Sequence, residues 1–198
     1  MPTKKRSKVD EFIATSTDPR FVSYRLRATA YHEAGHATAA FLLLGADAVR
    51  EVSIKPDEAA ETWGHVAHSA LDFQPGDLEL GSSAYFERLG RFAEYAVIAF
   101  AGNEAQKMWG GRYDWVGSDS DLEYLDHLAG AATRSETEAQ AFTVWIMERT
   151  ATLLRGRGAQ AIFPAIAEAL LKRETLTGEE IAAIARDAVL KAAIGQAT

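Results

Sequence analysis

The sequence predicts a mainly helical α+β fold. Long segments without proline carry apolar residues at helical spacing, and they make up most of the chain. Two short segments, residues 49–55 and 63–69, instead show the alternation and the β-favouring residues of strands. Ser/Thr-x-x-Glu patterns at Ser135 and Thr177 mark later helix starts. Together these features predict a long helix, a small β-sheet and a C-terminal helical bundle.

The first long helix is expected at residues 20–44. This segment has no proline, and its apolar residues can form one stripe: Leu26, Ala30, Ala37, Ala40, Phe41 and Leu44. Gly45 follows as a stop signal. Gly35 is unusual inside a helix, where glycine costs roughly 1 kcal/mol relative to alanine. Among so many alanines, it indicates that a neighbouring element packs very close.

The middle of the chain is expected to pair the two strands into a small sheet. Three segments follow: a loop at residues 71–83, a helix at residues 84–109 and a connector at residues 112–120. Gly90 and Gly102 are expected to break or bend that helix.

The last part of the chain is predicted to be helical. Three helices are expected there: from Ser135 to about residue 154, from Ala159 or Pro164 to Lys172, and at residues 179–193. Glu138 and Glu180 complete the capping patterns ahead of the first and the last of them.

Composition limits the class of protein. The 198 residues are 47% hydrophobic, enough for one good core. We expect residues 1–19, with a short basic run, to be a mobile arm and residues 20–198 to form a single domain. A net charge of −7 argues against a nucleic-acid partner. The longest apolar runs, residues 39–44 and 96–101, are too short to span a membrane. The absence of cysteine excludes thiolate metal sites and is typical of a cytoplasmic protein.

The first helix carries the pattern His-Glu-x-x-His at His32, Glu33 and His36. Positions i and i+4 lie on one face of a helix, so both imidazoles can bind one cation. Glu33 is then placed to accept a proton from a metal-activated water. The pattern predicts a zincin-like metal helix, although two partly buried structural histidines would produce the same spacing.

A catalytic zinc usually has three protein ligands, so a third is required. The extended pattern with a downstream histidine fails, because Leu42 occupies that position. Glu94 and Glu104 are candidates, but both are expected on the polar face of their helix. An aspartate within residues 117–122 is the remaining choice, and a helix-capping role would equally explain it.

Four segments of the sequence resemble segments of one known protein family. Residues 30–37 resemble the zinc motif of the FtsH family of membrane-anchored AAA+ proteases. Three later segments are similar to that family in the same order: its glycine-bounded helix at residues 102–110, its Gly-Ala-Ser-Asn-Asp-Leu segment at residues 117–122 and its late helix–turn–helix at residues 169–181. The resemblance runs from about residue 30 to residue 184.

The resemblance implies that Asp121, and not Asp119, is the third zinc ligand. The family has a glutamate pair before this segment, and its first member supports the site by hydrogen bonding. Gln106 and Lys107 occupy these positions here. Glutamine lacks the charge that raises ligand basicity, so metal affinity or rate can differ.

The implied function is a stand-alone, ATP-independent zinc metalloendopeptidase, because neither a Gly-Lys pair for nucleotide binding nor a membrane segment occurs in the sequence. Peptides or unfolded polypeptides are the expected substrates, and a separate ATPase or a specific protein partner can deliver them. An extended substrate is expected to add as a strand along residues 63–69, with Trp63 and His65 at the edge. The oligomeric state stays open.

A rival interpretation is a zinc-stabilised binding or regulatory module that keeps the fold without useful turnover. Gln106 and the missing ATPase favour it, whereas the intact Glu33 argues against it.

Overall fold

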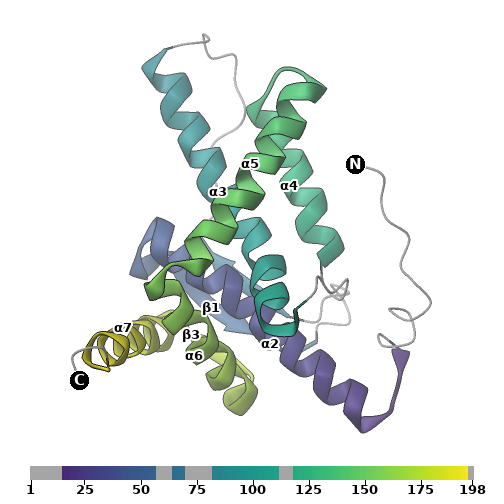
Figure 1. Ribbon diagram of the computed structural model, residues 1–198, viewed down its shortest axis with the longest axis vertical. Helices are drawn as coiled ribbons and strands as arrows, with labels where there is room; N and C mark the ends of the chain where they lie inside the picture. The colour runs from purple at the N-terminus through teal and green to yellow at the C-terminus, as the bar shows by residue number, and fades with distance from the viewer. Residues whose placement is uncertain (1–14, 57–63, 70–81, 112–117, 196–198) are drawn as a thin grey trace.

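Helices dominate the computed structural model, and a small antiparallel sheet lies beside them (Figure 1). The structure describes residues 15–56, 64–69, 82–111 and 118–195, without the side chains of residues 118 and 119. The elements in chain order are α2 (Pro19–Leu44), the 3₁₀ helix η1 (Ala46–Ala48), β1 (Val49–Ser53), β2 (His65–His68), α3 (Ser83–Gly110), α4 (Ser118–Ala132), α5 (Glu136–Arg155), α6 (Arg157–Arg173), β3 (Thr175–Thr177) and α7 (Gly178–Ile194). The predicted fold class is confirmed. Residues 1–14 of the predicted basic arm, residues 71–81 of the predicted loop and residues 112–117 of the predicted connector lie outside the described residues.

Helix α2 is the central element. Asp18 caps its start by accepting a hydrogen bond from the Arg20 backbone N–H at 2.9 Å, and Pro19 occupies the first helical position. The helix ends at Gly45, whose φ of 98° suits a residue without a side chain. Every residue from Ala28 to Ala40 is buried, so this part of α2 is covered on all sides.

Helix α3 packs directly on α2, and glycine permits the close approach. A Cβ on Gly35 would lie 2.4 Å from the Ala101 carbonyl oxygen and 2.6 Å from the Ala105 Cβ. The sequence prediction of a closely packed neighbour is therefore confirmed. The expected break in α3 is wrong, because the helix runs without interruption through Gly90 and Gly102 until Gly111 adopts a left-handed conformation.

The sheet has the strand order β2-β1-β3, so β2 and β3 form its edges. In the central strand, Val52 pairs with Val66 on one side and with Leu176 on the other. Both strands predicted from sequence are present and are antiparallel. The third was not predicted, because residues 175–177 are too few for a periodic signal and become a strand only by pairing with β1.

The C-terminal helices follow the predicted order with two corrections. Helix α6 begins at Arg157 and runs through Pro164, where the sequence placed a start at Ala159 or Pro164. An interior proline costs about 3 kcal/mol, but the burial of neighbouring apolar residues, including Phe163 and Ile166, offsets it. The connector before α4 is also shorter than expected, because that helix begins at Ser118.

Both predicted capping patterns occur, one completely and one in part. Thr177 and Glu180 form a full capping box at the start of α7. The Ser135 hydroxyl accepts from the Glu138 N–H, whereas the Glu138 carboxylate accepts from Arg134.

Two apolar clusters divide the interior, and α3 joins them. The first involves α2, the sheet, α6, α7 and residues such as Ile98 and Ala101 of α3. The second involves α4, α5 and the earlier part of α3, including Phe92 and Phe100. In Figure 1 the second group stands above the first. The polar side chains of the candidate site, described below, lie on the helices that meet between the two clusters.

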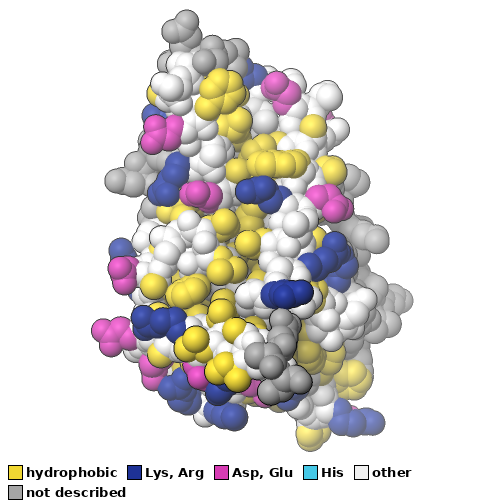
Figure 2. All heavy atoms as spheres, turned by 60° about the vertical axis from the view of Figure 1, so that its left-hand side comes forward, with side chains coloured by type: hydrophobic (Ala, Val, Ile, Leu, Met, Phe, Trp, Pro, Cys, Tyr) yellow, Lys and Arg dark blue, Asp and Glu magenta, His cyan; other side chains and the backbone are white. Residues whose placement is uncertain are grey.

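One face of the molecule shows hydrophobic side chains among charged ones (Figure 2). Val189, Leu190 and Ile194 of α7 are among the large hydrophobic side chains that are exposed. Among the described residues, no helix is both long and apolar enough to cross a membrane.

The contact between α2 and α3 yields a stability prediction. Gly35→Ala should destabilise the protein by about 1–3 kcal/mol, because its methyl group meets the α3 backbone. Gly90→Ala is the matched control: nothing lies within 4 Å of its added methyl group, so it should gain up to about 1 kcal/mol. Urea unfolding measures both. A Gly35→Ala protein as stable as Gly90→Ala would contradict the described packing.

Candidate functional site

The candidate site begins on the buried part of α2. His32 and His36 lie one turn apart, and their Nε2 atoms are 3.0 Å from each other. Both side chains are buried, as is Glu33 beside them. Two imidazole nitrogens this close repel each other unless a proton or a metal cation lies between them. The arrangement is therefore suited to a cation.

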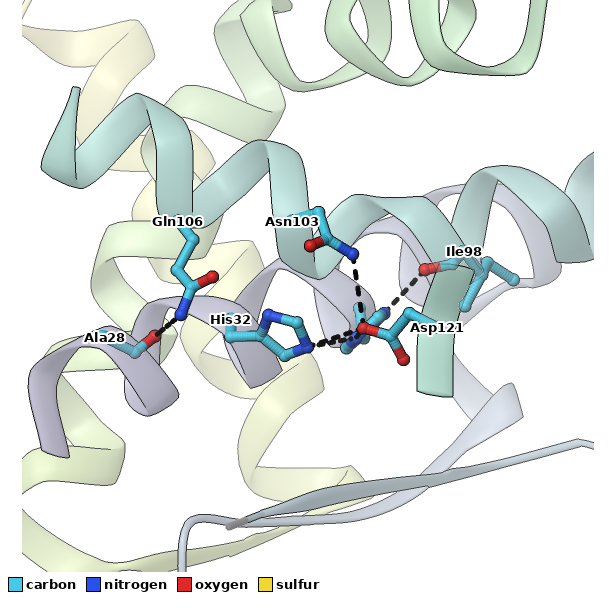
Figure 3. Close-up of polar contacts among 7 residues, drawn as sticks. Ala28, His32, Ile98, Asn103, Gln106 and Asp121 are labelled. Atoms are coloured by element: carbon cyan, nitrogen blue, oxygen red, sulfur yellow. Dashed lines mark hydrogen bonds and ion pairs between the residues drawn. The ribbon is translucent and has the colours of Figure 1, made fainter. Parts of the chain in front are cut away.

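Helix α4 adds a carboxylate to this pair. Oδ2 of Asp121 is 2.8 Å from Nε2 of His32 and 3.3 Å from Nε2 of His36 (Figure 3). One ligand atom from each of the three residues lies within 4.8 Å of the others. Within the described part of the chain, His32, His36 and Asp121 form the group of histidine and carboxylate side chains whose spacing suits a metal ion.

The other sequence candidates lie elsewhere or are not described. Glu94 pairs with Arg91, and Glu104 contacts Lys107 and Arg155. The expectation that Glu104 lies on a polar face is wrong, because only 1% of it is exposed. The side chain of Asp119 is outside the described part of the chain.

Two hydrogen bonds orient the group, and the sequence interpretation missed both. Nδ1–H of His36 donates to the Ile98 carbonyl oxygen at 2.7 Å, which directs Nε2 toward the site. The side-chain N–H of Asn103 donates to Oδ2 of Asp121 at 3.4 Å. A backbone acceptor leaves no sequence signal. Asn103 left a weak sequence signal, since it is a polar residue that follows the apolar run at residues 96–101 after Gly102.

The space and the donor set fit a tetrahedral metal. A Cβ on Gly102 would lie 2.4 Å from Nε2 of His36 and 2.7 Å from Nε2 of His32, so glycine leaves this position open. Ligand atoms of a tetrahedral zinc are roughly 3.3 Å apart, given Zn–N distances of about 2.0–2.1 Å. The separations observed here, 2.8–3.3 Å, are within about half an ångström of that value. Two nitrogens and one carboxylate oxygen are a usual ligand set for zinc.

Burial and mutual charge set the protonation of the site. Burial raises the pKa of Glu33, and the nearby histidines offset this only in part. Burial opposes protonation of His36, but the Asp121 carboxylate, together with Glu33 and the Ile98 carbonyl, outweighs it and raises the His36 pKa to about 9. Conversely, burial would raise the pKa of Asp121, but the two histidines hold it below its usual range. Without a metal, His36 therefore retains its proton at neutral pH.

Comparison with known proteins finds a partial relative. No family model matches the chain. The chain is 31% identical over 189 residues to a protein named ATP-dependent zinc metalloprotease FtsH 2 from Sphaerobacter thermophilus. The match covers 82% of this chain but 27% of that protein, so the chain spans about a quarter of its relative's length. The similarity supports a relationship to the FtsH family.

Gln106 lies on α3 with its side chain directed toward α2 (Figure 3). Its side-chain N–H donates to the Ala28 carbonyl oxygen at 3.4 Å. Its Oε1 and Nδ1 of His32 are both buried and have no hydrogen-bond partner in the described part of the chain. The expectation that Gln106 supports the zinc site by a hydrogen bond therefore stays a prediction.

The sheet approaches the site through Gly64 and His65. A Cβ on Gly64 would lie 2.8 Å from Oε1 of Glu33, so the start of β2 packs against this carboxylate. His65 is half-exposed, and its Nε2 is 3.4 Å from a Glu51 carboxylate oxygen. Trp63, the other predicted edge residue, lies outside the described residues.

Tyr31 stacks on Trp109 with ring centroids 5.2 Å apart, and His127 is exposed.

The raised pKa of His36 predicts how the metal-free protein responds to pH. Its folded-state pKa of about 9 exceeds the ordinary value of 6.5. Protonated His36 therefore contributes stability below pH 6.5, and this contribution is lost as pH rises through 9. The free energy of unfolding of chelator-treated protein, measured in urea, should fall across this interval. His36→Gln should flatten the fall, whereas His127→Gln should not; equal slopes in both variants would refute the assignment.

Proposed function

We propose that this chain is a zinc-dependent metallopeptidase related to the FtsH family, acting on peptides or unfolded polypeptides. The main support is the buried group formed by His32, His36 and Asp121, with Glu33 beside it. The similarity to a named zinc metalloprotease supports the same class of reaction. We further propose that residues 20–198 act as one peptidase domain. A cytoplasmic location stays a prediction.

In this proposal, His32, His36 and Asp121 hold the zinc. When bound, zinc would polarise a peptide carbonyl and make a neighbouring water more acidic. Glu33 accepts a proton from the attacking water and then passes it to the leaving amine as the C–N bond breaks. Burial assists this exchange, because it raises the pKa of Glu33 and so makes its carboxylate a better proton acceptor.

The sheet edge offers a place for an extended substrate. Strand β2 is an edge strand, and Gly64, which directly precedes it, lies so close to Glu33 that an added Cβ would be 2.8 Å from its Oε1. A peptide that adds to β2 as a further strand would therefore pass close to the proposed base. We propose that residues 63–69, including Trp63 and His65, guide the substrate.

Hydrolysis by these 198 residues is proposed to be independent of ATP, because the sequence contains no Gly-Lys pair. Folded proteins would then require prior unfolding, by a separate ATPase or by a specific partner. Peptides and exposed termini would not.

The second candidate function is a zinc-stabilised binding module with little turnover. Gln106 favours it, because a neutral amide replaces the family's carboxylate and Nδ1 of His32 lacks a partner among the described residues. If the protein binds zinc stoichiometrically but cleaves no peptide in a mixed library, this result would support the binding module over the peptidase.

The role of Glu33 is tested by Glu33→Gln. The variant should lose hydrolysis of a mixed peptide library, by a factor of at least about 100, because proton transfer is removed. It should retain zinc, because the proposed ligands are unchanged. Mass spectrometry of the peptides and metal analysis of the protein measure the two effects. Cleavage equal to wild type, or loss of zinc, would count against the assignment.

The choice of carboxylate ligand is tested by comparing Asp121→Asn with Asp119→Asn. Replacing Asp121 removes a charged oxygen from the histidine pair, so zinc affinity should fall at least tenfold more than on replacing Asp119. Competition with a chromophoric chelator measures both affinities. Equal losses would overturn the choice of Asp121.

A further inference from the structure

Asn103 is a buried polar residue at the junction of α3 and α4. It follows Gly102 on α3, and only 3% of it is exposed. Its side chain points to Asp121 at the start of α4 (Figure 3), and Nδ2 lies 3.4 Å from Oδ2. Burying a side-chain amide is costly unless it is hydrogen-bonded, and this contact supplies a hydrogen-bond partner for the buried amide.

The acceptor of this bond is the oxygen that meets both histidines. Oδ2 of Asp121 lies 2.8 Å and 3.3 Å from the two Nε2 atoms, and the amide of Asn103 approaches the same atom. Three nitrogen-bearing side chains from α2 and α3 therefore converge on one oxygen from α4. The amide nitrogen faces the carboxylate, since the amide oxygen would be repelled there.

Asp121 needs such support more than the histidines do. His32 and His36 hold their separation because they share one helix turn, and Ile98 fixes the ring of His36. Asp121 belongs to a different helix, and a fifth of its side chain is exposed. Its carboxylate can rotate away from the pair unless a donor holds it.

We propose that Asn103 is a positioning residue that holds the Asp121 carboxylate toward the histidine pair, so that a divalent cation finds its third ligand in place. The amide suits this role chemically. It donates a hydrogen bond without adding a positive charge that would repel the cation, and its nitrogen has no available lone pair with which to bind the metal itself. This role rests on the proposed zinc site.

The test compares zinc affinity in variants that remove the donor. Asn103→Leu keeps a similar volume, and Asn103→Ala removes it, so one variant remains informative if the other fails to fold. Thr38→Val is the matched control, because Thr38 is fully buried on α2 and its hydroxyl has no hydrogen-bond partner in the described part of the chain. Affinity is measured by chelator competition with zinc. Urea unfolding in excess chelator separates loss of metal binding from loss of fold.

Both Asn103 variants should bind zinc about 10–100-fold more weakly than wild type, and Thr38→Val should bind it within about twofold. Substituted with Co²⁺, the Asn103 variants should also show a changed visible spectrum, because the carboxylate is no longer held in one orientation. A purely structural role would lower stability without moving this spectrum.

Three results would overturn the proposal. Affinity within twofold of wild type in the Asn103 variants would remove the role of Asn103 and leave the zinc site intact. An equal loss in Thr38→Val would show that any buried polar residue nearby has the same effect. Absence of zinc binding by the wild-type protein would instead overturn the proposed function, and the role of Asn103 with it.

Discussion

The close approach of α2 and α3 is the constraint on which the site depends. Gly35 lets the two backbones meet, and Gly102 leaves space beside the histidine nitrogens on the same pair of helices. A methyl group at the first position would separate the helices, and one at the second would enter the space between the imidazoles. The two glycines therefore serve different purposes at one interface: one allows packing, and the other leaves room for a cation.

This interface places polar groups in the interior, where each needs a partner. The Ile98 carbonyl satisfies His36, and Asp121 satisfies the histidine pair, while Asn103 contacts Asp121. A buried carboxylate and a buried imidazole are costly alone but stabilise each other in contact. Because α3 contributes to both apolar clusters, it brings the α4 carboxylate to the histidines of α2, a helix whose apolar residues belong to the other cluster. The geometry of the candidate site is thus a consequence of how the two clusters are joined.

The relative with which the chain shares sequence is almost four times longer than the match, so the likeness concerns one part of that protein. The proposed chemistry uses residues of this chain alone. Two histidines, an aspartate and a glutamate are sufficient ingredients for zinc-assisted hydrolysis. Gln106 is the main departure from the family pattern, and in this structure its amide bonds to the α2 backbone at Ala28. The chain therefore combines the proposed ligands His32, His36 and Asp121 with a glutamine at position 106 that differs from the family pattern.

The sequence alone determined the elements and the local chemistry. Helical periodicity placed His32, Glu33 and His36 on one buried helix, and capping patterns located the starts of α5 and α7. These signals are local, because helices and their caps depend on residues within a few positions. Asp121 was favoured over the other carboxylates only through the family resemblance.

The tertiary structure decided what depends on contacts between distant segments. It brought Asp121 to the histidines, assigned Asn103 and the Ile98 carbonyl to their support, and created β3 by pairing it with β1. It also buried Glu104 and carried α6 through Pro164, against local preference. Such outcomes arise because burial energy summed over a whole interface exceeds the propensity of any single residue. His36 and Ile98 are 62 residues apart in the chain, and no local pattern relates them.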